Sequence, residues 1–490
     1  MSNRVVPTGI SGLDHLLLGG LQADRLYLVQ GDPGVGKTTL ALQFLLDGVS
    51  RGDKGMYVTF SETKGEVESV AASHGWSLNG IEVFEFGELQ SALAGERAGT
   101  VFHPAETELA AVTGRLWRMF ERAAPSRLVF DSIAELRLLS GDSLRYRRQL
   151  LDLKARTSAR RCTTLLLDDR TATERDLQLQ SLAHGVFSLQ RIAADYGSAK
   201  RRLEIVKFRG LAFRDGLHDF TIRTGGLVVY PRLVAAEHAQ VERGTLKSGI
   251  APLDALVGGG LDRGSGTLLL GPAGAGKSTV ALRFVLSAAE QGERSVVYNF
   301  DESLSMLRSR SAGLGMDLSP HERAERIVLK SVNSAELTPG QFAADIRRRV
   351  EDDGAKVVVL DSLNGYLNAM PGERHLVLHL HELLAYAAAR GVVMLFVTSQ
   401  LGIMGVQPQQ PVDASYLADA VILFRYYEFR GTVRQAISVF KRRGGSHERT
   451  IRELTLGPPN GIEVGAPLRD FRGVLAGTPV YLGDGSEKEP

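Results

Sequence analysis

The sequence has little of several features that would mark particular classes of protein. It holds one cysteine, Cys162, which excludes an internal disulfide or a cysteine zinc site and favours a reducing, cytoplasmic environment. No apolar run approaches the ~18 residues that span a bilayer, and the first residues lack the apolar core of a signal peptide. The formal net charge is only +2, so no global charge favours nucleic acid. The chain of 490 residues is expected to be a soluble protein of more than one domain.

An internal repeat organises the chain. Residues 12–45 and 252–285 share a Leu-Asp pair followed by Gly-Gly-Leu, and Lys277 follows Lys37 by 240 residues. Later pairs are separated by 230 or 234 residues, as small deletions in loops would produce. A repeat of this length indicates a duplicated domain rather than a solenoid. Further related pairs are Asp14 and Asp254, Gly20 and Gly260, Glu62 and Glu302, Asp131 and Asp361, and Lys207 and Lys441.

Each copy alternates short β-rich runs with helical patterns. Runs that are apolar on both faces, separated by helices, predict an α/β fold with a parallel sheet and helices outside it. A polar stretch at 231–244 predicts domains at residues 1–236 and 237–482, and a disordered tail at 483–490. The expected strands include residues 26–30, 56–60, 128–130 and 164–167 in the first copy, and 296–300, 357–360 and 393–397 in the second.

Each copy contains a complete phosphate-binding loop. Residues 31–38 (GDPGVGKT) and 271–278 (GPAGAGKS) fit G-x-x-x-x-G-K-[ST], and each follows an apolar strand and opens a helix. Glycines let backbone N–H groups surround a β-phosphate, and the lysine reaches the β- and γ-oxygens. We therefore expect two tandem RecA-like P-loop NTPase domains with mostly parallel central sheets. The expected ATP-binding residues are Gly31, Gly34, Gly36, Lys37, Thr38 and Thr39, and Gly271, Gly274, Gly276, Lys277, Ser278 and Thr279.

Carboxylates at the ends of later strands complete the expected sites. An aspartate ends an apolar run in each copy, in register with the phosphate loop, where it can bind Mg²⁺ together with the loop hydroxyl. The expected Mg²⁺ ligands are Thr38, Asp131, Ser278 and Asp361. Attack on the γ-phosphate needs a base that polarises water, and acidic residues follow the second strand of each copy. The candidates are Glu62, Asp301 and Glu302.

The duplicated loops, the Phe-Asp-Glu-Ser segment at 300–303 and the basic runs at 207–210 and 441–444 resemble the KaiC family, the double-domain ATPases and autokinases of circadian clocks. The resemblance extends from about Pro7 to about Leu482. It implies a two-tiered homohexamer in which basic residues of one subunit reach the nucleotide of its neighbour. Lys and Arg spaced by two on a strand point to one face, and an arginine supplied in trans neutralises γ-phosphate charge. The residues carried over are Lys207, Arg209, Lys441 and Arg443.

The resemblance also implies serine/threonine autokinase activity in the second domain. The family's adjacent Ser–Thr acceptor pair corresponds to Ser415 and Tyr416, so the serine is kept and a tyrosine replaces the threonine. A phenol is longer than a threonine hydroxyl, which makes Ser415 the expected main acceptor. Asp301 replaces the family's first glutamate. Ser61 stands at that position in the first domain, which leaves Glu62 as its only local candidate base.

The C-terminal residues indicate which partner proteins to expect. Residues 467–473 resemble the family's regulatory loop, and beyond it only residues 481–490 remain, without the longer tail that binds KaiA. We therefore expect no KaiA dependence, while a KaiB-like partner is compatible with the resemblance.

Two other functions stay open. One is a DNA-dependent RecA-class motor, which the near-neutral charge disfavours. The other is an ATP-binding signalling scaffold with little turnover, which the departures from the family pattern at Ser61 and Tyr416 keep open.

Overall fold

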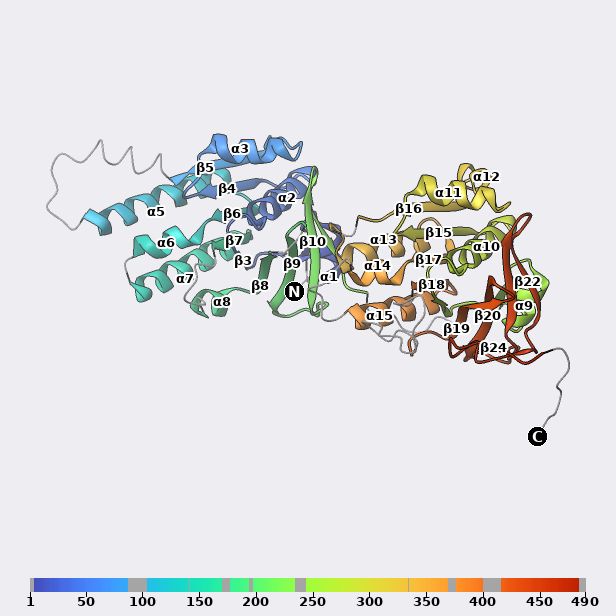
Figure 1. The fold of residues 1–490 in the computed structure, drawn as a ribbon. Coiled ribbons are helices and arrows are strands. Elements are labelled where there is room, and N and C mark those ends of the chain that lie inside the picture. Colours follow the sequence, from blue (N-terminus) through green and yellow to red (C-terminus); the bar gives the residue numbers. More distant parts are fainter. Residues whose placement is uncertain are drawn as a thin grey trace. The chain divides into compact units, whose positions relative to one another are not determined.

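The computed structural model describes residues 4–86, 104–140, 142–169, 177–193, 197–233, 244–333, 335–368, 376–399 and 416–483. The chain divides into two compact units, Met1–Arg232 and Leu233–Pro490. Each unit is built around a nine-stranded sheet, and Figure 1 shows helices packed beside both sheets. Within the ranges just given, no helix combines the length and the apolar character needed to cross a membrane.

The sheet of the first unit is parallel from β8 to β5 and antiparallel from β8 to β11. In spatial order its strands are β11 (Gly226–Tyr230), β10 (Leu217–Arg223), β9 (Lys200–Phe208), β8 (Gly185–Ile192), β3 (Leu26–Gly31), β7 (Thr163–Asp169), β6 (Arg127–Asp131), β4 (Gly55–Thr59) and β5 (Ile81–Glu85). The helices are α1 (Ser11–Leu16), α2 (Lys37–Ser50), α3 (Lys64–Ser73), α5 (Pro104–Ala123), α6 (Ile133–Ser140), α7 (Ser143–Ala159) and α8 (Leu177–Leu182).

The second unit repeats this topology. From one edge to the other its sheet contains β22 (Gly461–Pro467), β21 (Arg452–Gly457), β20 (Thr432–Arg442), β19 (Ala420–Phe429), β14 (Gly266–Gly271), β18 (Val393–Ser399), β17 (Ala355–Asp361), β15 (Arg294–Asn299) and β16 (Ile327–Ser331). Its helices are α9 (Ala251–Leu256), α10 (Lys277–Glu290), α11 (Leu304–Gly313), α12 (Ser319–Arg323), α13 (Pro339–Glu351), α14 (Leu363–Asn368) and α15 (Leu376–Ala388). Short ribbons pair β1 (Val5–Val6) with β2 (Leu21–Gln22), β12 (Thr245–Leu246) with β13 (Leu261–Asp262), and β23 (Phe471–Arg472) with β24 (Val480–Tyr481). The two mostly parallel sheets confirm the predicted α/β class.

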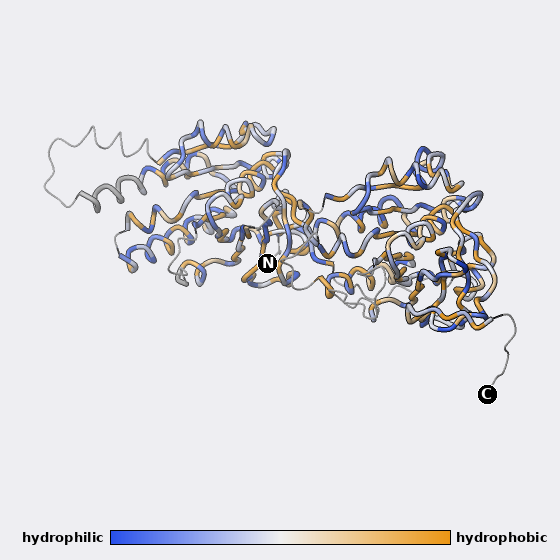
Figure 2. The backbone as a smooth tube through the Cα atoms, in the orientation of Figure 1, coloured by the Kyte–Doolittle hydropathy of each residue, from blue (hydrophilic) through white to orange (hydrophobic). Residues whose placement is uncertain are grey.

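Each sheet has a hydrophobic core on both faces. In β3, Tyr27 and Val29 enter the core formed with α1, α2 and α3, whereas Leu26 and Leu28 enter the core formed with α5, α6, α7 and α8. This division follows from the two-residue period of a strand. In the surrounding helices, hydrophobic and hydrophilic residues are interspersed along the coloured tube (Figure 2). Burial on both faces explains why the central strands are continuous apolar runs.

A buried arginine ties the phosphate-loop helix α2 to strand β6. Arg127 opens β6 and is 1% exposed. Its guanidinium lies 3.0 Å from Asp47 Oδ2 and 2.9 Å from Asp53 Oδ2, and it donates hydrogen bonds to the carbonyl oxygens of Pro7 and Phe44. Because Asp47 and Phe44 lie in α2, this network fixes the helix that begins at the phosphate loop against the strand that ends at Asp131.

Arg127→Ala should destabilise the first unit by about 3–5 kcal/mol, because it leaves a largely buried carboxylate at Asp47 without its main partner. Arg51→Ala is the matched control, since Arg51 pairs with the same Asp47 but is mostly exposed and should cost less than about 1 kcal/mol. The only two tryptophans, Trp76 and Trp117, both lie in the first unit. Urea unfolding followed by tryptophan fluorescence therefore reports on this unit, and equal shifts in both variants would contradict the account.

Candidate nucleotide-binding sites

The two phosphate loops connect β3 to α2 and β14 to α10, at the carboxyl ends of central strands. Gly36 and Gly276 directly precede these helices with φ of 115° and 97°, in the left-handed region that favours glycine. A Cβ at Gly36 would lie 2.5 Å from the side chain of Ile222. The glycines of the motif therefore serve both the turn and the packing of β10 beneath it.

Both loop lysines are buried and bind the loop itself. Lys37 Nζ donates to the carbonyl oxygens of Gly31 and Asp32 at 2.9 and 3.0 Å, and lies 2.6 Å from Asp169 Oδ1. Lys277 Nζ donates to the Pro272 carbonyl oxygen at 2.5 Å. Burial lowers the pKa of Lys277 to about 8, although Asp361 acts in the opposite sense. An anion placed at either loop would stabilise the charged lysine.

A hydroxyl and a carboxylate meet beside each loop. Thr38 Oγ1 donates to Asp131 Oδ2 at 3.0 Å, and the Tyr57 hydroxyl donates to the same oxygen. Burial raises the pKa of Asp131, and it raises the pKa of Asp361 to about 6, while a hydrogen bond from Ser278 lowers it. Oxygen ligands of this kind suit Mg²⁺, which binds through few protein ligands together with waters and phosphates. The residues therefore fit Mg²⁺, and a cation here would relieve the cost of the buried carboxylate.

The candidate bases lie just beyond β4 and β15, and their backbones are held in the same way. Thr59 Oγ1 donates to the Glu62 carbonyl and accepts from its N–H. Asn299 Nδ2 donates to the Glu302 carbonyl, and Asn299 Oδ1 accepts from the Glu302 N–H. The side chains differ: among the described residues Glu62 Oε2 is buried without a hydrogen-bond partner, whereas Glu302 lies 2.5 Å from Arg310. Burial, followed by the charge of Asp131, raises the pKa of Glu62.

The two basic pairs lie at the ends of β9 and β20. Lys207 Nζ donates to the Gln180 carbonyl at 2.6 Å, and Arg209 donates to the Ser181 carbonyl at 3.1 Å. Lys441 and Arg443 bind the carbonyl oxygens of Ala418 and Tyr416 at 2.9 and 2.8 Å. Both arginines lie one residue beyond the strands that were expected to carry them. Each lysine nevertheless binds the same short segment as its arginine.

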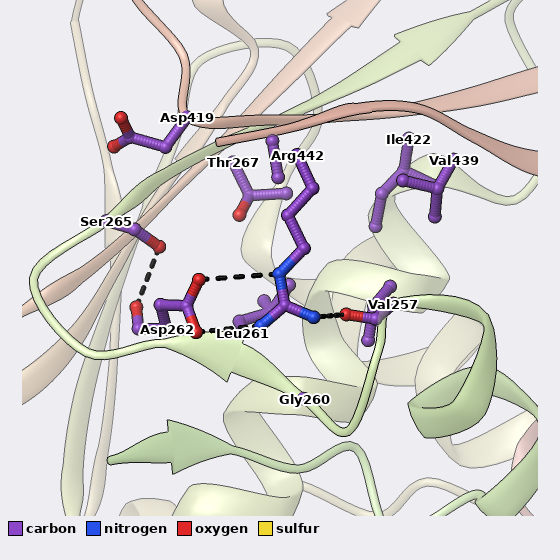
Figure 3. Close-up of a pocket in the computed structure, with 11 residues that line it drawn as sticks. Val257, Gly260, Leu261, Asp262, Ser265, Thr267, Asp419, Ile422, Val439 and Arg442 are labelled. Atoms are coloured by element: carbon purple, nitrogen blue, oxygen red, sulfur yellow. Dashed lines mark hydrogen bonds and ion pairs between the residues drawn. The ribbon is translucent and has the colours of Figure 1, made fainter. Parts of the chain in front are cut away.

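The residue between the second pair, Arg442, has other partners, and Figure 3 shows its guanidinium beside Asp262 and Val257. Its guanidinium pairs with Asp262 at 2.7 Å and donates to the carbonyl oxygens of Val257 and Ser446. The corresponding residue of the first unit is Phe208, which enters the hydrophobic core. Because side chains alternate along a strand, the middle position of each basic run is structural and only the flanking positions are available to a ligand.

The proposed acceptor residues fall at the edge of the described chain. Ser415 lies outside the described residues. Tyr416 is 54% exposed, and its carbonyl oxygen accepts the hydrogen bond from Arg443. The position of the tyrosine ring in solvent fits a residue that does not contribute to the core.

An open cleft of about 650 Å³ brings the second-unit residues together. Its lining includes Gly274, Gly276, Lys277, Ser278, Thr279, Asp301, Glu302, Arg310, Leu314 and Asp361. The loop, the Mg²⁺-side carboxylate and the candidate bases, which come from separate stretches of sequence, therefore line one cavity. Asp301 is exposed at the rim, and Glu302 is only partly exposed.

Sequence reasoning missed three residues at these sites. Asp169 ends β7 beside the phosphate loop and pairs with Lys37. Arg310 pairs with Glu302 from α11, and His74 Nε2 lies 3.3 Å from Thr39 Oγ1. Asp169 could have been found, because it ends an apolar run next to the loop strand. Arg310 and His74 lie within or just beyond helices, where no local pattern marks them.

A family model described as the KaiC ATPase matches residues 6–234 and 246–469. The chain belongs to the KaiC family. Both matched segments contain a phosphate loop, its aspartate and its candidate base, so the family assignment covers both sites. It confirms the resemblance, and it makes the protein a KaiC-family ATPase with two tandem domains, for which nucleotide binding is the shared property.

Curated relatives align with nearly the whole KaiC-family chain. Circadian clock protein KaiC3 from Synechocystis sp. is 28% identical over 483 residues, covering 97% of this chain and 94% of that protein. Circadian clock oscillator protein KaiC from Synechococcus elongatus is 28% identical over 483 residues, covering 97% and 92%. The KaiC of Thermostichus vulcanus is 27% identical over 489 residues, covering 98% and 92%. The similarity is therefore not restricted to the nucleotide loops.

Asp361→Asn should stabilise the second unit above about pH 6. The folded pKa of Asp361, about 6, exceeds its ordinary value of 3.8, because burial disfavours the charged form. The folded state therefore binds this proton more tightly, and the carboxyl costs stability as pH rises from about 4 to about 6, by up to about 3 kcal/mol. Denaturation followed by circular dichroism should show a gain of about 1–3 kcal/mol at about pH 7.5 that shrinks near pH 4. Glu428→Gln, at an exposed carboxylate, is the control; a gain that does not depend on pH would contradict the assignment.

Proposed function

We propose that this KaiC-family protein hydrolyses Mg·ATP at both sites, assembles as a hexamer and transfers phosphate to its own second domain, so that it acts as an ATP-driven timing or signalling switch. The observation that carries the proposal is the convergence at each site of the loop lysine, a hydroxyl–aspartate pair and a glutamate at the carboxyl ends of parallel strands of one sheet. In the second unit these groups line one cleft.

The roles follow from the positions of the groups. Lys37 and Lys277 exchange loop carbonyls for the β- and γ-oxygens of ATP. Mg²⁺, when bound, neutralises charge that develops on the phosphates during transfer. Thr38 with Asp131, and correspondingly Ser278 with Asp361, would hold it. These assignments use only groups that already lie together at the loop.

Glu62 and Glu302 are proposed as the general bases. A base must accept the proton of the attacking water while the oxygen of that water approaches the γ-phosphorus. Glu62 supports this role because its buried oxygen has no partner among the described residues, and because burial raises its pKa above the ordinary value. Glu302 has the same backbone position. Asp301, at the exposed rim, is the second candidate in that unit.

The proposed hexamer gives the basic pairs a function. Lys207, Arg209, Lys441 and Arg443 bind carbonyl oxygens, which compensate a positive charge only in part. We propose that they reach the γ-phosphate held by a neighbouring subunit, where Arg is suited to stabilise transition-state charge. The sites would then be complete only in the assembly.

Glu62→Gln and Glu302→Gln should each remove the hydrolysis of their own site by about 10²–10⁴-fold, because glutamine keeps the shape and loses the base. Phosphate release in the presence of Mg·ATP measures the rates, and equilibrium binding of a fluorescent ATP analogue checks that both variants still bind nucleotide. Lys37→Ala and Lys277→Ala are the controls that should lose binding. A double glutamine variant with wild-type phosphate release would overturn the assignment of the bases.

Mass-resolved mapping after incubation with Mg·ATP should find phosphate mainly on Ser415 and little on Tyr416. The reason is that a phenol oxygen lies further from the backbone than a serine hydroxyl and cannot share its line of attack. Ser415→Ala should remove most of the label while ATP hydrolysis continues, and light scattering of the same sample should give about six times the chain mass of 53.1 kDa. ATP consumption without phosphate on either residue would limit the function to an ATPase.

A further inference from the structure

The two sites differ at one position of the helix that follows the candidate base. Helices α3 and α11 occupy equivalent positions, 240 residues apart, and Val70 in α3 corresponds to Arg310 in α11. Val70 packs against the hydrophobic core of its unit. Arg310 instead sends its guanidinium to Glu302, with 2.5 Å between Arg310 Nη2 and Glu302 Oε1.

The backbone does not account for the difference. Thr59 and Asn299 hold the main chains of Glu62 and Glu302 through equivalent pairs of hydrogen bonds. The backbones of Glu62 and Glu302 therefore occupy equivalent positions in the two units. Among the described residues, Glu302 forms an ion pair with a cation, whereas one carboxylate oxygen of Glu62 is buried without a hydrogen-bond partner.

Arg310 also lies inside the nucleotide cleft rather than behind it. It lines the same cavity as Lys277, Ser278 and Asp361. The Arg310 and Glu302 side chains are 32% and 27% exposed, so the ion pair is reachable by water and by salt. Because the ion pair is partly exposed, its interaction energy is small, so it can open during turnover. While it is closed, it still favours one orientation of the Glu302 carboxylate.

We propose that Arg310 is a positioning residue that restrains Glu302, so that the second site hydrolyses ATP more slowly than its own chemistry would allow. The inference rests on the proposed role of Glu302 as base. In hydrolysis a water oxygen bonds to the γ-phosphorus, the bond from that phosphorus to the bridging oxygen of ADP breaks, and the water proton passes to Glu302. The ion pair at Oε1 fixes the direction in which the Glu302 carboxylate points, so the carboxylate has to turn away from Arg310 to present an oxygen to that water. The first site has no such restraint because Val70 carries no charge.

The test measures the second site alone, in a Glu62→Gln background that silences the first. Arg310→Ala should raise kcat for phosphate release by about two- to fivefold, the gain expected when a partly exposed ion pair no longer has to open, with KM changed by less than about twofold. Arg310→Lys keeps the charge and should restore most of the restraint. Raising salt from about 0.05 to about 0.5 M should increase kcat of the parent and leave Arg310→Ala unchanged, since salt screens the pair.

The reciprocal variant transfers the restraint to the first site. In a Glu302→Gln background, Val70→Arg should lower kcat, whereas Val70→Leu, which tests packing alone, should not. An unchanged or lower kcat in Arg310→Ala, or an equal salt response with and without Arg310, would overturn the proposal and make Arg310 a phosphate-binding or structural residue. Hydrolysis that persists in the Glu62→Gln, Glu302→Gln double variant would instead refute the proposed function, whatever the Arg310 variants do.

Discussion

The carboxyl ends of the parallel strands meet at one edge of each sheet, and the remainder of both sites depends on this arrangement. The loop after β3 supplies Lys37 and Thr38, β6 ends at Asp131, and the turn after β4 supplies Glu62. Their side chains meet because the sheet places these strands near one another, as the 3.0 Å hydrogen bond from Thr38 to Asp131 shows. The second unit obtains the same result from β14, β17 and β15.

Each site holds charges that a folded protein ordinarily keeps in water. Burial lowers the pKa of Lys277 and raises those of Asp131 and Asp361. The cost of these buried charges is recovered when a polyanion and a divalent cation bind, which gives a physical reason for nucleotide-dependent stability. The two units compensate these charges with different ion pairs. In the first unit Lys37 pairs with Asp169, and in the second unit Glu302 pairs with Arg310. The two units therefore differ in the charges around their sites while they share one topology.

Much of the fold could be predicted from the sequence, because a central strand buried on both faces is a continuous apolar run and the phosphate loop is a fixed local pattern. The repeat then placed Asp131 with Asp361 and Glu62 with Glu302. Side-chain contacts that depend on tertiary packing could not be predicted from the sequence. Arg310 gives no local signal for its contact with Glu302, and Arg442 looks like a third member of a basic cluster until the strand shows it facing Asp262. Strands β9 and β20 also end one residue before Arg209 and Arg443, which were expected to lie on them.

The central claim is that one chain carries two nucleotide sites built in the same way. Native mass spectrometry in Mg²⁺ with a non-hydrolysable ATP analogue tests it most directly, by counting bound nucleotides per chain. The account predicts two for the wild-type protein, one for Lys37→Ala, one for Lys277→Ala and none for the double variant. A single nucleotide per wild-type chain, or two that survive either substitution, would contradict it.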